Sequence, residues 1–157
     1  MIVHRHWRRW LVIAGLAVAS LARGESLSPE ATVTRYLTAL KAGKFAEAYD
    51  CVSKAMAQNK PREDWAREQQ WLAQTTEAKI FDFKVYPAKI EGEKAFVPDL
   101  LSSQDKYLNQ LGVEEHELYT LIREDGQWKI NQQQDVENSN VPKWFPPATK
   151  TQESATP

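Results

Sequence analysis

The chain has 157 residues, of which 20 are basic and 21 acidic, and its net charge at pH 7 is −1. This length suits one domain with a hydrophobic core, because domains commonly contain about 100–200 residues. Cys51 is the only cysteine, so an intramolecular disulfide is excluded and packing must stabilise the fold. At a partly apolar helical position, a lone cysteine is more often a small core residue than a nucleophile.

The first segment has the three-part layout of a secretory signal peptide. Arginines and histidines precede a mostly apolar run over residues 10–22, and small residues follow it. The run is short for a spanning helix, which needs about 20 apolar residues, although an uncleaved anchor and a buried helix remain the alternatives. We expect residues 1–24 to be removed, with cleavage after Ala19, Ala22 or Gly24, and the protein to be exported to the periplasm or beyond without a permanent membrane anchor.

Removal of residues 1–24 changes the charge balance. Four arginines are lost and no acidic residue, which leaves 16 basic against 21 acidic residues and a net charge of −5. Binding to nucleic acid depends on clustered lysines and arginines that neutralise phosphates. The acidic balance therefore argues against a nucleic-acid partner.

The first predicted helix begins with a clear start signal. Ser28 is a good N-cap and Pro29 suits the first helical position, where its missing N–H costs nothing. Gly43 ends the helix at a position that favours a left-handed residue. One face of this helix is lined by residues at helical spacing, namely Val33, Tyr36, Leu37 and Leu40.

Two more helices are predicted before residue 75. The second begins directly after Gly43 and has its apolar stripe at Phe45, Ala48, Tyr49 and Val52, with Met56 as a further extension. The third runs from Pro61 to about Gln74, with a stripe made by Trp65, Gln69 and Leu72. The short connection between the first two helices requires them to turn sharply against each other.

The hydrophobic period then changes from helix to strand. Residues 78–90 alternate, with Phe81, Phe83 and Val85 on one face, and Pro87 is expected at an edge or a bulge because it has no ladder donor. Residues 95–102 form the next predicted strand, interrupted by Pro98. Residues 103–112 have no clean period and are expected to form a loop with a helical turn.

A hairpin over residues 113–131 is predicted to form the centre of the sheet. Residues 117–124 and 127–131 are rich in β-favouring side chains, and Asp125-Gly126 between them suits a tight turn. Strands that follow one another through short turns pair antiparallel. Three helices followed by about four such strands indicate an α+β fold in which helices cover one face of the sheet.

Residues 136–157 contain four prolines and many polar residues, so this tail is expected to be largely disordered. Trp144-Phe145 is the exception. The aromatic pair docks either on its own domain or on a partner, and docking on its own domain is the commoner outcome because exposed apolar clusters are avoided.

The segments PEATVTRYLTALKAGKFAEAYDCVS (29–53) and YTLIREDGQWKIN (119–131), with the Trp-containing third helix between them, resemble the nuclear transport factor 2-like superfamily. The likeness covers about residues 28–135 and is closest to small secreted bacterial members. It implies a cone: a strongly curved antiparallel sheet of about four strands wraps three helices and leaves a cavity. It also implies homodimerisation through the outer sheet face. Some relatives are enzymes, such as ketosteroid isomerases and scytalone dehydratases, and others bind ligands or proteins without chemistry.

Four residues are candidates for lining the cavity and binding a ligand. His116 is the only histidine left after signal removal and acts as an acid or base if its strand face is concave, although an exposed histidine beside glutamates, with no orienting partner, is the commoner case. Tyr36 and Tyr49 are either pocket donors or core residues whose hydroxyls reach a polar partner. Trp128 is either a core plug or a binding platform.

No catalytic or metal-binding constellation is evident. Glu115, His116 and Glu117 alternate between faces of a strand, so they cannot converge on a metal, and no cofactor is expected. The leading hypothesis is a secreted or periplasmic binding or interaction module without catalysis. One alternative is a small-molecule lyase or isomerase that uses the cone cavity with His116, Tyr36 and Tyr49. Another is an accessory subunit of a cell-envelope complex, recognised through Trp144 and Phe145 as partner-binding residues.

Overall fold

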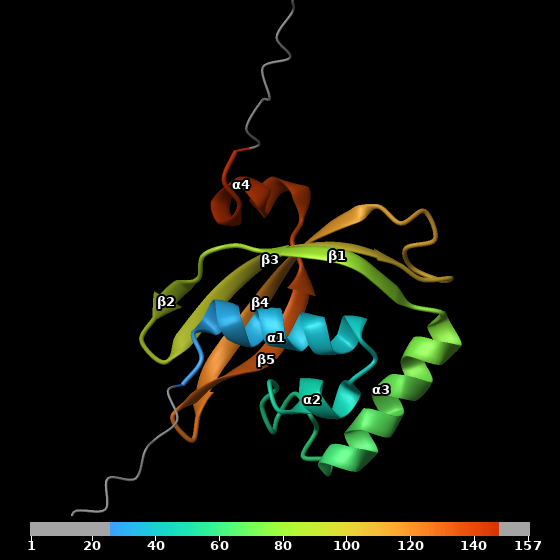
Figure 1. The fold of residues 1–157 in the computed structure, drawn as a ribbon. Coiled ribbons are helices and arrows are strands. Elements are labelled where there is room, and N and C mark those ends of the chain that lie inside the picture. The colour runs from blue at the N-terminus through green and yellow to red at the C-terminus, as the bar shows by residue number, and fades with distance from the viewer. Residues whose placement is uncertain (1–25, 148–157) are drawn as a thin grey trace, which may run out of the picture.

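The computed structural model describes residues 26–147, which form helices packed against one face of an antiparallel sheet (Figure 1). The fold class is α+β, as the sequence predicted. The predicted signal peptide (1–24) and the end of the predicted tail (148–157) lie outside the described residues. No helix within the described part of the chain has the length and apolar character needed to cross a membrane.

Helix α1 (Pro29–Lys41) begins and ends as its sequence predicts. The Ser28 hydroxyl accepts a hydrogen bond from the Ala31 backbone N–H (3.1 Å), which satisfies one of the free donors at the helix start. Gly43 follows the helix with a φ of +70°, a conformation that disfavours a residue with a Cβ. The predicted stripe faces the sheet, with Val33, Tyr36 and Leu37 buried.

Helix α2 (Phe45–Tyr49) is shorter than predicted. The chain leaves the helix at Asp50, and Val52 instead forms a parallel bridge with Ile130 of the sheet. Ser53 donates its N–H to the Ile130 carbonyl (2.8 Å), so the backbone here pairs with a strand instead of continuing the helix. Helix α3 (Arg62–Thr76) matches the predicted third helix, and its Trp65 is buried.

The sheet has five strands instead of about four. They are β1 (Lys79–Val85), β2 (Lys89–Glu91), β3 (Lys94–Gln104), β4 (Glu114–Glu124) and β5 (Gln127–Asp135). The order is β1-β3-β4-β5, all pairs are antiparallel, and the short β2 also pairs with β3. The additional strand arises because the predicted 78–90 strand divides at Pro87.

Two prolines lie in or beside the sheet. Pro87 lies between β1 and β2, outside any ladder, as predicted. Pro98 does not interrupt its strand, contrary to expectation: β3 continues through it, and the Pro98 carbonyl accepts from the Tyr86 N–H (2.9 Å). Tyr86 and Pro98 are thus connected by this one backbone hydrogen bond, since Pro98 has no N–H to donate in return.

Strand β1 contains a bulge that the alternating sequence pattern did not reveal. The register shifts between Ile80 and Asp82, so Ile80, Phe83 and Val85 pack against the core while Phe81 is half-exposed. The predicted face of Phe81, Phe83 and Val85 is therefore wrong at its first position. A bulge adds one unpaired residue and redirects the side chains on either side of it.

The β4–β5 hairpin has the predicted turn, with φ of +51° at Asp125 and +76° at Gly126. The hairpin is not wholly central, however. β4 lies between β3 and β5, whereas β5 is an edge strand, protected at one point by the Val52 bridge.

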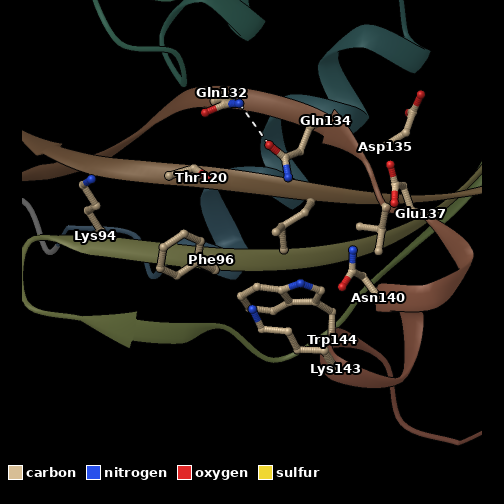
Figure 2. Close-up of a pocket in the computed structure, with 12 residues that line it drawn as sticks. Lys94, Phe96, Thr120, Gln132, Gln134, Asp135, Glu137, Asn140, Lys143 and Trp144 are labelled. Carbon is tan, nitrogen blue, oxygen red and sulfur yellow. Dashed lines mark hydrogen bonds between the residues drawn. The ribbon is translucent and has the colours of Figure 1, made fainter.

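The C-terminal segment lies on the outer face of the sheet, opposite α1, α2 and α3 (Figure 1). It contains η1 (Asn138–Asn140) and α4 (Val141–Trp144), so these residues are ordered where disorder was expected. Phe145 is buried against His116 (ring centroids 4.6 Å apart) and Tyr86 (5.2 Å). Trp144 lies beside Phe96 at 5.6 Å (Figure 2). The aromatic pair therefore docks on its own domain because these strands offer it an apolar surface.

Candidate functional site

The interior between the helices and the sheet contains two buried carboxylates that sequence reasoning did not select. Asp99 of β3 and Glu117 of β4 are direct cross-strand partners on the helix-covered face. Asp99 interrupts a strand face that is otherwise apolar, made by Ala95, Val97 and Leu101. A carboxylate at an inward position of such an alternation is the sequence signal that would have identified it.

Asp99 is fully buried, and neither of its carboxylate oxygens has a hydrogen-bond partner among the described residues. Burial, together with the neighbouring charge of Glu117, raises the pKa of Asp99 to about 7, although the nearby Lys84 backbone amide offsets this in part. A buried charge without a partner is costly, so the protonated form is favoured below about neutral pH.

Glu117 has partners. The Tyr119 hydroxyl donates to one carboxylate oxygen (2.8 Å), and the Gln133 side-chain amide donates to the other (2.9 Å). Burial raises the pKa of Glu117, and these two hydrogen bonds oppose the increase. Burial and the Glu117 charge also raise the pKa values of Tyr119 and Tyr36, so both phenols stay protonated and can donate.

This acid cluster has the polar groups of a proton-transfer site, and its tyrosines are packed into the core. Tyr36 packs edge-on against Tyr119 at 6.2 Å, and both belong to the buried core with Leu37 and Val97. Neither Asp99 nor Glu117 lines the groove or the pockets described below. A general acid or base must reach the proton that it transfers, and both carboxyl groups are buried away from that groove and those pockets.

The four predicted cavity residues do not share a cavity. Tyr36 is in the core, and the Tyr49 hydroxyl donates to the Lys60 carbonyl (2.9 Å) while its ring packs on Trp65. Trp128 is buried, with the Arg123 guanidinium 4.2 Å from its ring centroid, and it lines a small pocket at the edge of the core. These three are on the helix side of the sheet.

His116 lies on the opposite, outer face. Phe145 covers its ring, and the Val136 N–H donates to its backbone carbonyl (2.7 Å). The condition under which we expected His116 to act in the cavity, a concave face, is therefore not met. Within residues 26–147, no group of three or more His, Cys, Asp or Glu side chains is arranged to hold a metal ion.

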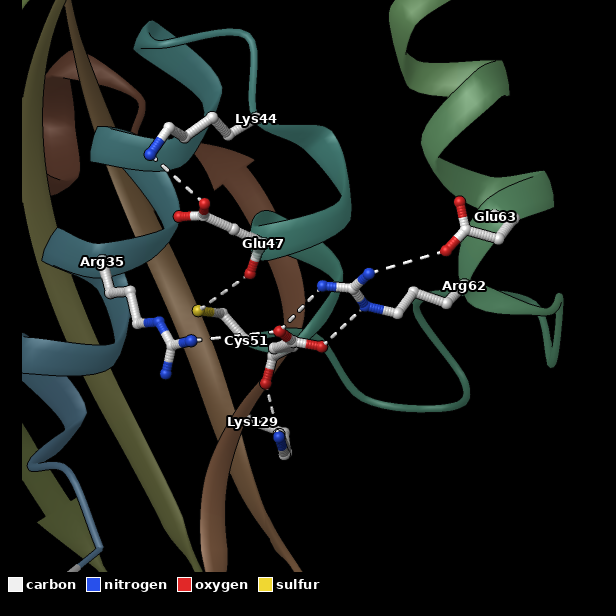
Figure 3. Close-up of polar contacts among 8 residues, drawn as sticks. Arg35, Lys44, Glu47, Cys51, Arg62, Glu63 and Lys129 are labelled. Atoms are coloured by element: carbon white, nitrogen blue, oxygen red, sulfur yellow. Dashed lines mark hydrogen bonds and ion pairs between the residues drawn. The ribbon is translucent and has the colours of Figure 1, made fainter.

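A second polar cluster brings side chains of α1, α3 and β5 to Asp50, which directly follows α2; Figure 3 shows its Arg35, Arg62 and Lys129 side chains. The Arg62 guanidinium donates to both Asp50 carboxylate oxygens (3.1 and 3.2 Å), and Arg35 lies 3.9 Å away. Lys129 donates to the Asp50 backbone carbonyl. Beside it, Cys51 is buried and burial raises the pKa of its thiol, so it is a core residue rather than an activated nucleophile. The cluster connects α1, α3 and β5 to the end of α2.

An open groove of about 500 Å³ lies between the helices and β1. It is lined by Leu40 and Lys41 of α1, Phe45 of α2, Gln69, Leu72, Ala73 and Thr76 of α3, and Ala78, Lys79, Ile80 and Phe81 around the start of β1. Leu72 and Phe81 are 41% and 50% exposed, so this groove presents two large apolar side chains to water. The β1 bulge places Phe81 here, which is why the alternation pattern missed this site.

No protein-family model matches the chain, and no curated protein sequence matches it. Solved structures share its fold at low identity. A SEC-C motif-containing protein from Rhodopseudomonas palustris is 16% identical over 74% of this chain and 86% of its own, with a TM-score of 0.54. A domain of unknown function with a cystatin-like fold from Nostoc punctiforme is 12% identical over 73% of this chain and 79% of its own, with a TM-score of 0.52.

A weaker structural likeness is to a protein described as NTF2-like. An NTF2-like (nuclear transport factor 2-like) protein of unknown function from Cytophaga hutchinsonii is 11% identical over 76% of this chain and 97% of its own, with a TM-score of 0.44. The two structures with TM-scores above 0.5 show the fold alone, and their low identities carry no functional information.

Proposed function

We propose that this protein is a secreted, non-catalytic binding module of the nuclear transport factor 2-like superfamily, and that it holds an amphiphilic anion in the groove between α1, α3 and β1. The observation that carries the proposal is that one groove combines exposed apolar side chains with two lysines, neither of which forms an ion pair among the described residues. Its volume of about 500 Å³ falls within the range of about 300–1,000 Å³ that small-molecule sites occupy.

The apolar wall supplies the binding energy. Leu72 and Phe81 expose large apolar surfaces to water, and Leu40 and Ile80 continue the same wall. Covering such surface with an alkyl chain is favourable by about 0.8 kcal/mol for each buried methylene. A ligand with a chain of several methylenes therefore fits this wall better than a compact polar molecule does.

The rim supplies the charge preference. Lys41 and Lys79 line the groove, no acidic residue lines it, and neither lysine forms an ion pair within residues 26–147. Lys41 uses one ammonium donor on the Phe81 carbonyl (2.5 Å) and keeps others for a ligand. Glu77, close to Lys79 in sequence, is paired with Lys106. An anionic head group complements this rim.

Binding of dodecanoate, measured by isothermal titration calorimetry, tests the proposal. Dodecanoate should bind at one saturable site, and dodecyltrimethylammonium should bind about tenfold more weakly or not at all, because its head group meets the lysines with like charge. Leu72→Asp should weaken dodecanoate binding by about tenfold or more, since it places a charge in the apolar wall.

The matched control is Leu111→Asp, which makes the same exchange at an exposed leucine outside the groove. It should leave dodecanoate affinity within about twofold of the parent protein. Equal affinity for the anionic and cationic amphiphiles, or equal sensitivity to the two leucine variants, would refute the proposed site.

A further inference from the structure

The outer face of the sheet carries a pocket of about 570 Å³ whose floor follows from strand register (Figure 2). Phe96 of β3, Thr120 of β4 and Gln132 of β5 form one cross-strand row, because Phe96 pairs with Thr120 and Thr120 with Gln132. In the next row, Leu118 pairs with Gln134. The floor is therefore aromatic at β3 and carries amides at the edge strand β5.

The C-terminal segment builds the wall of this pocket, which we call the outer-face pocket. Phe145 anchors the segment by packing against His116 and Tyr86. This anchor places Trp144 beside Phe96 (5.6 Å between centroids), with the Lys143 ammonium 4.8 Å from the indole centroid. Figure 2 shows the Asn140 side chain at the same side of the pocket as Trp144. The wall thus extends the aromatic end of the floor upward from the sheet.

The polar end presents both donors and acceptors. The Gln132 side-chain amide donates to the Gln134 side-chain carbonyl (3.0 Å; Figure 2). This bond leaves the Gln134 nitrogen as a donor and the Gln132 oxygen as an acceptor, neither with a partner among the described residues. The Thr120 hydroxyl and the Asn140 amide add groups that both donate and accept.

Charge does not favour an ionic ligand here. Two lysines, Lys94 and Lys143, and two carboxylates, Asp135 and Glu137, line the pocket, so its formal charges cancel. The lining is thus neutral overall, aromatic at one end and amide-bearing at the other. A suitable ligand is uncharged, with an apolar surface and several hydroxyl groups close together.

We propose that the outer-face pocket binds a neutral carbohydrate. A pyranose ring has a C–H face that packs on aromatic side chains and an edge of vicinal hydroxyls that pair with planar amides. The site uses neither the groove nor its lysines, so this inference is independent of the proposed amphiphile binding. In this proposal the C-terminal segment has a binding role, because its Asn140, Lys143 and Trp144 line the pocket.

Isothermal titration calorimetry of the protein with cellotriose, maltotriose and chitotriose tests the inference. At least one of these neutral trisaccharides should bind at a single site. Trp144→Ala and Gln134→Ala should each weaken that binding by about tenfold. Gln134 is exposed on an edge strand, so its variant keeps the test decisive even if Trp144→Ala loosens the C-terminal segment.

Matched controls exist on α3, away from the pocket. Trp71→Ala and Gln70→Ala remove the same side-chain types from exposed positions and should leave trisaccharide affinity within about twofold. Absence of saturable binding for all three trisaccharides would overturn the inference. Tighter binding of a charged analogue, trigalacturonate or the chitosan trimer, or equal effects of pocket and control variants, would also overturn it.

Discussion

Asp99 of β3 and Glu117 of β4 are directly opposed cross-strand neighbours, and both are buried. Like charges at directly opposed positions of a sheet repel, and burial removes the water that would screen them. Glu117 receives hydrogen bonds from Tyr119 and Gln133, whereas Asp99 receives none from the described residues. Repulsion between the two carboxylates is therefore avoided because Asp99 keeps its proton up to about neutral pH, consistent with its pKa of about 7.

Asp99→Asn should stabilise the protein at alkaline pH. The folded-state pKa of Asp99, about 7, lies above its ordinary value of 3.8, so ionisation favours the unfolded chain. The wild-type protein should have its full stability from this group below pH 3.8, lose it as pH rises, and reach the full loss above pH 7. That loss amounts to at most about 4 kcal/mol, because one pKa unit corresponds to about 1.4 kcal/mol.

Urea unfolding at several pH values between 4 and 9 measures this effect. The stability of the Asn variant should fall less steeply with pH than that of the wild type. Asp82→Asn, which changes an exposed carboxylate on β1, serves as control and should leave the pH dependence as it is. Identical pH profiles for wild type and Asp99→Asn would contradict the assignment.

Tyr119→Phe should destabilise the fold by about 1–3 kcal/mol at pH 7, because it leaves one buried oxygen of Glu117 without its donor. The ring and its packing against Tyr36 are retained, so the change isolates the hydroxyl. Denaturant unfolding gives the difference. Tyr107→Phe removes the hydroxyl of an exposed tyrosine, and a comparable loss in this control would rule out the proposed cause.

Phe145→Ala should release the C-terminal segment without unfolding the domain. Phe145 packs on the outer face, while the main core lies on the other side of the sheet. Hydrogen exchange should therefore become about tenfold or more faster at the Val136 amide, which donates to His116, with little change at the β3–β4 amides. Unchanged protection at Val136 would show that other contacts hold the segment.

Asp50→Asn should have only a small effect, about 0.2–1 kcal/mol, and the effect should shrink in high salt. Asp50, Arg35 and Arg62 are each roughly half exposed, so water screens their attraction. Thermal unfolding at low and high salt measures the difference. A loss of several kcal/mol that persists in high salt would mean that the Asp50 cluster is a buried network.

Homodimerisation, expected from the superfamily resemblance, stays a prediction. The outer sheet face through which it was expected is partly covered by α4 and Phe145 (Figure 1). A dimer through this face would have to form around the C-terminal segment or displace it. Export and removal of residues 1–24 likewise remain predictions, since those residues lie outside the described part of the chain.

Local sequence signals predicted the parts of the fold that local physics controls. The Ser28 cap, the α1 stripe and the Asp125-Gly126 turn depend on neighbouring residues, and each appears as expected. Predictions failed where the backbone N–H and C=O groups of a segment pair with a segment that is distant in sequence. Residues after Asp50 have a helical apolar pattern, yet Val52 and Ser53 pair with Ile130, which is far away in sequence.

The sequence by itself determined that helices precede an antiparallel sheet and that one face of each is apolar, because side-chain periodicity follows directly from backbone geometry. Only the tertiary structure decided which polar groups meet. The bulge that places Phe81 in the groove, the opposition of Asp99 and Glu117, and the docking of Trp144 over Phe96 depend on strand register and on contacts between distant segments. No periodicity within one segment encodes such pairings.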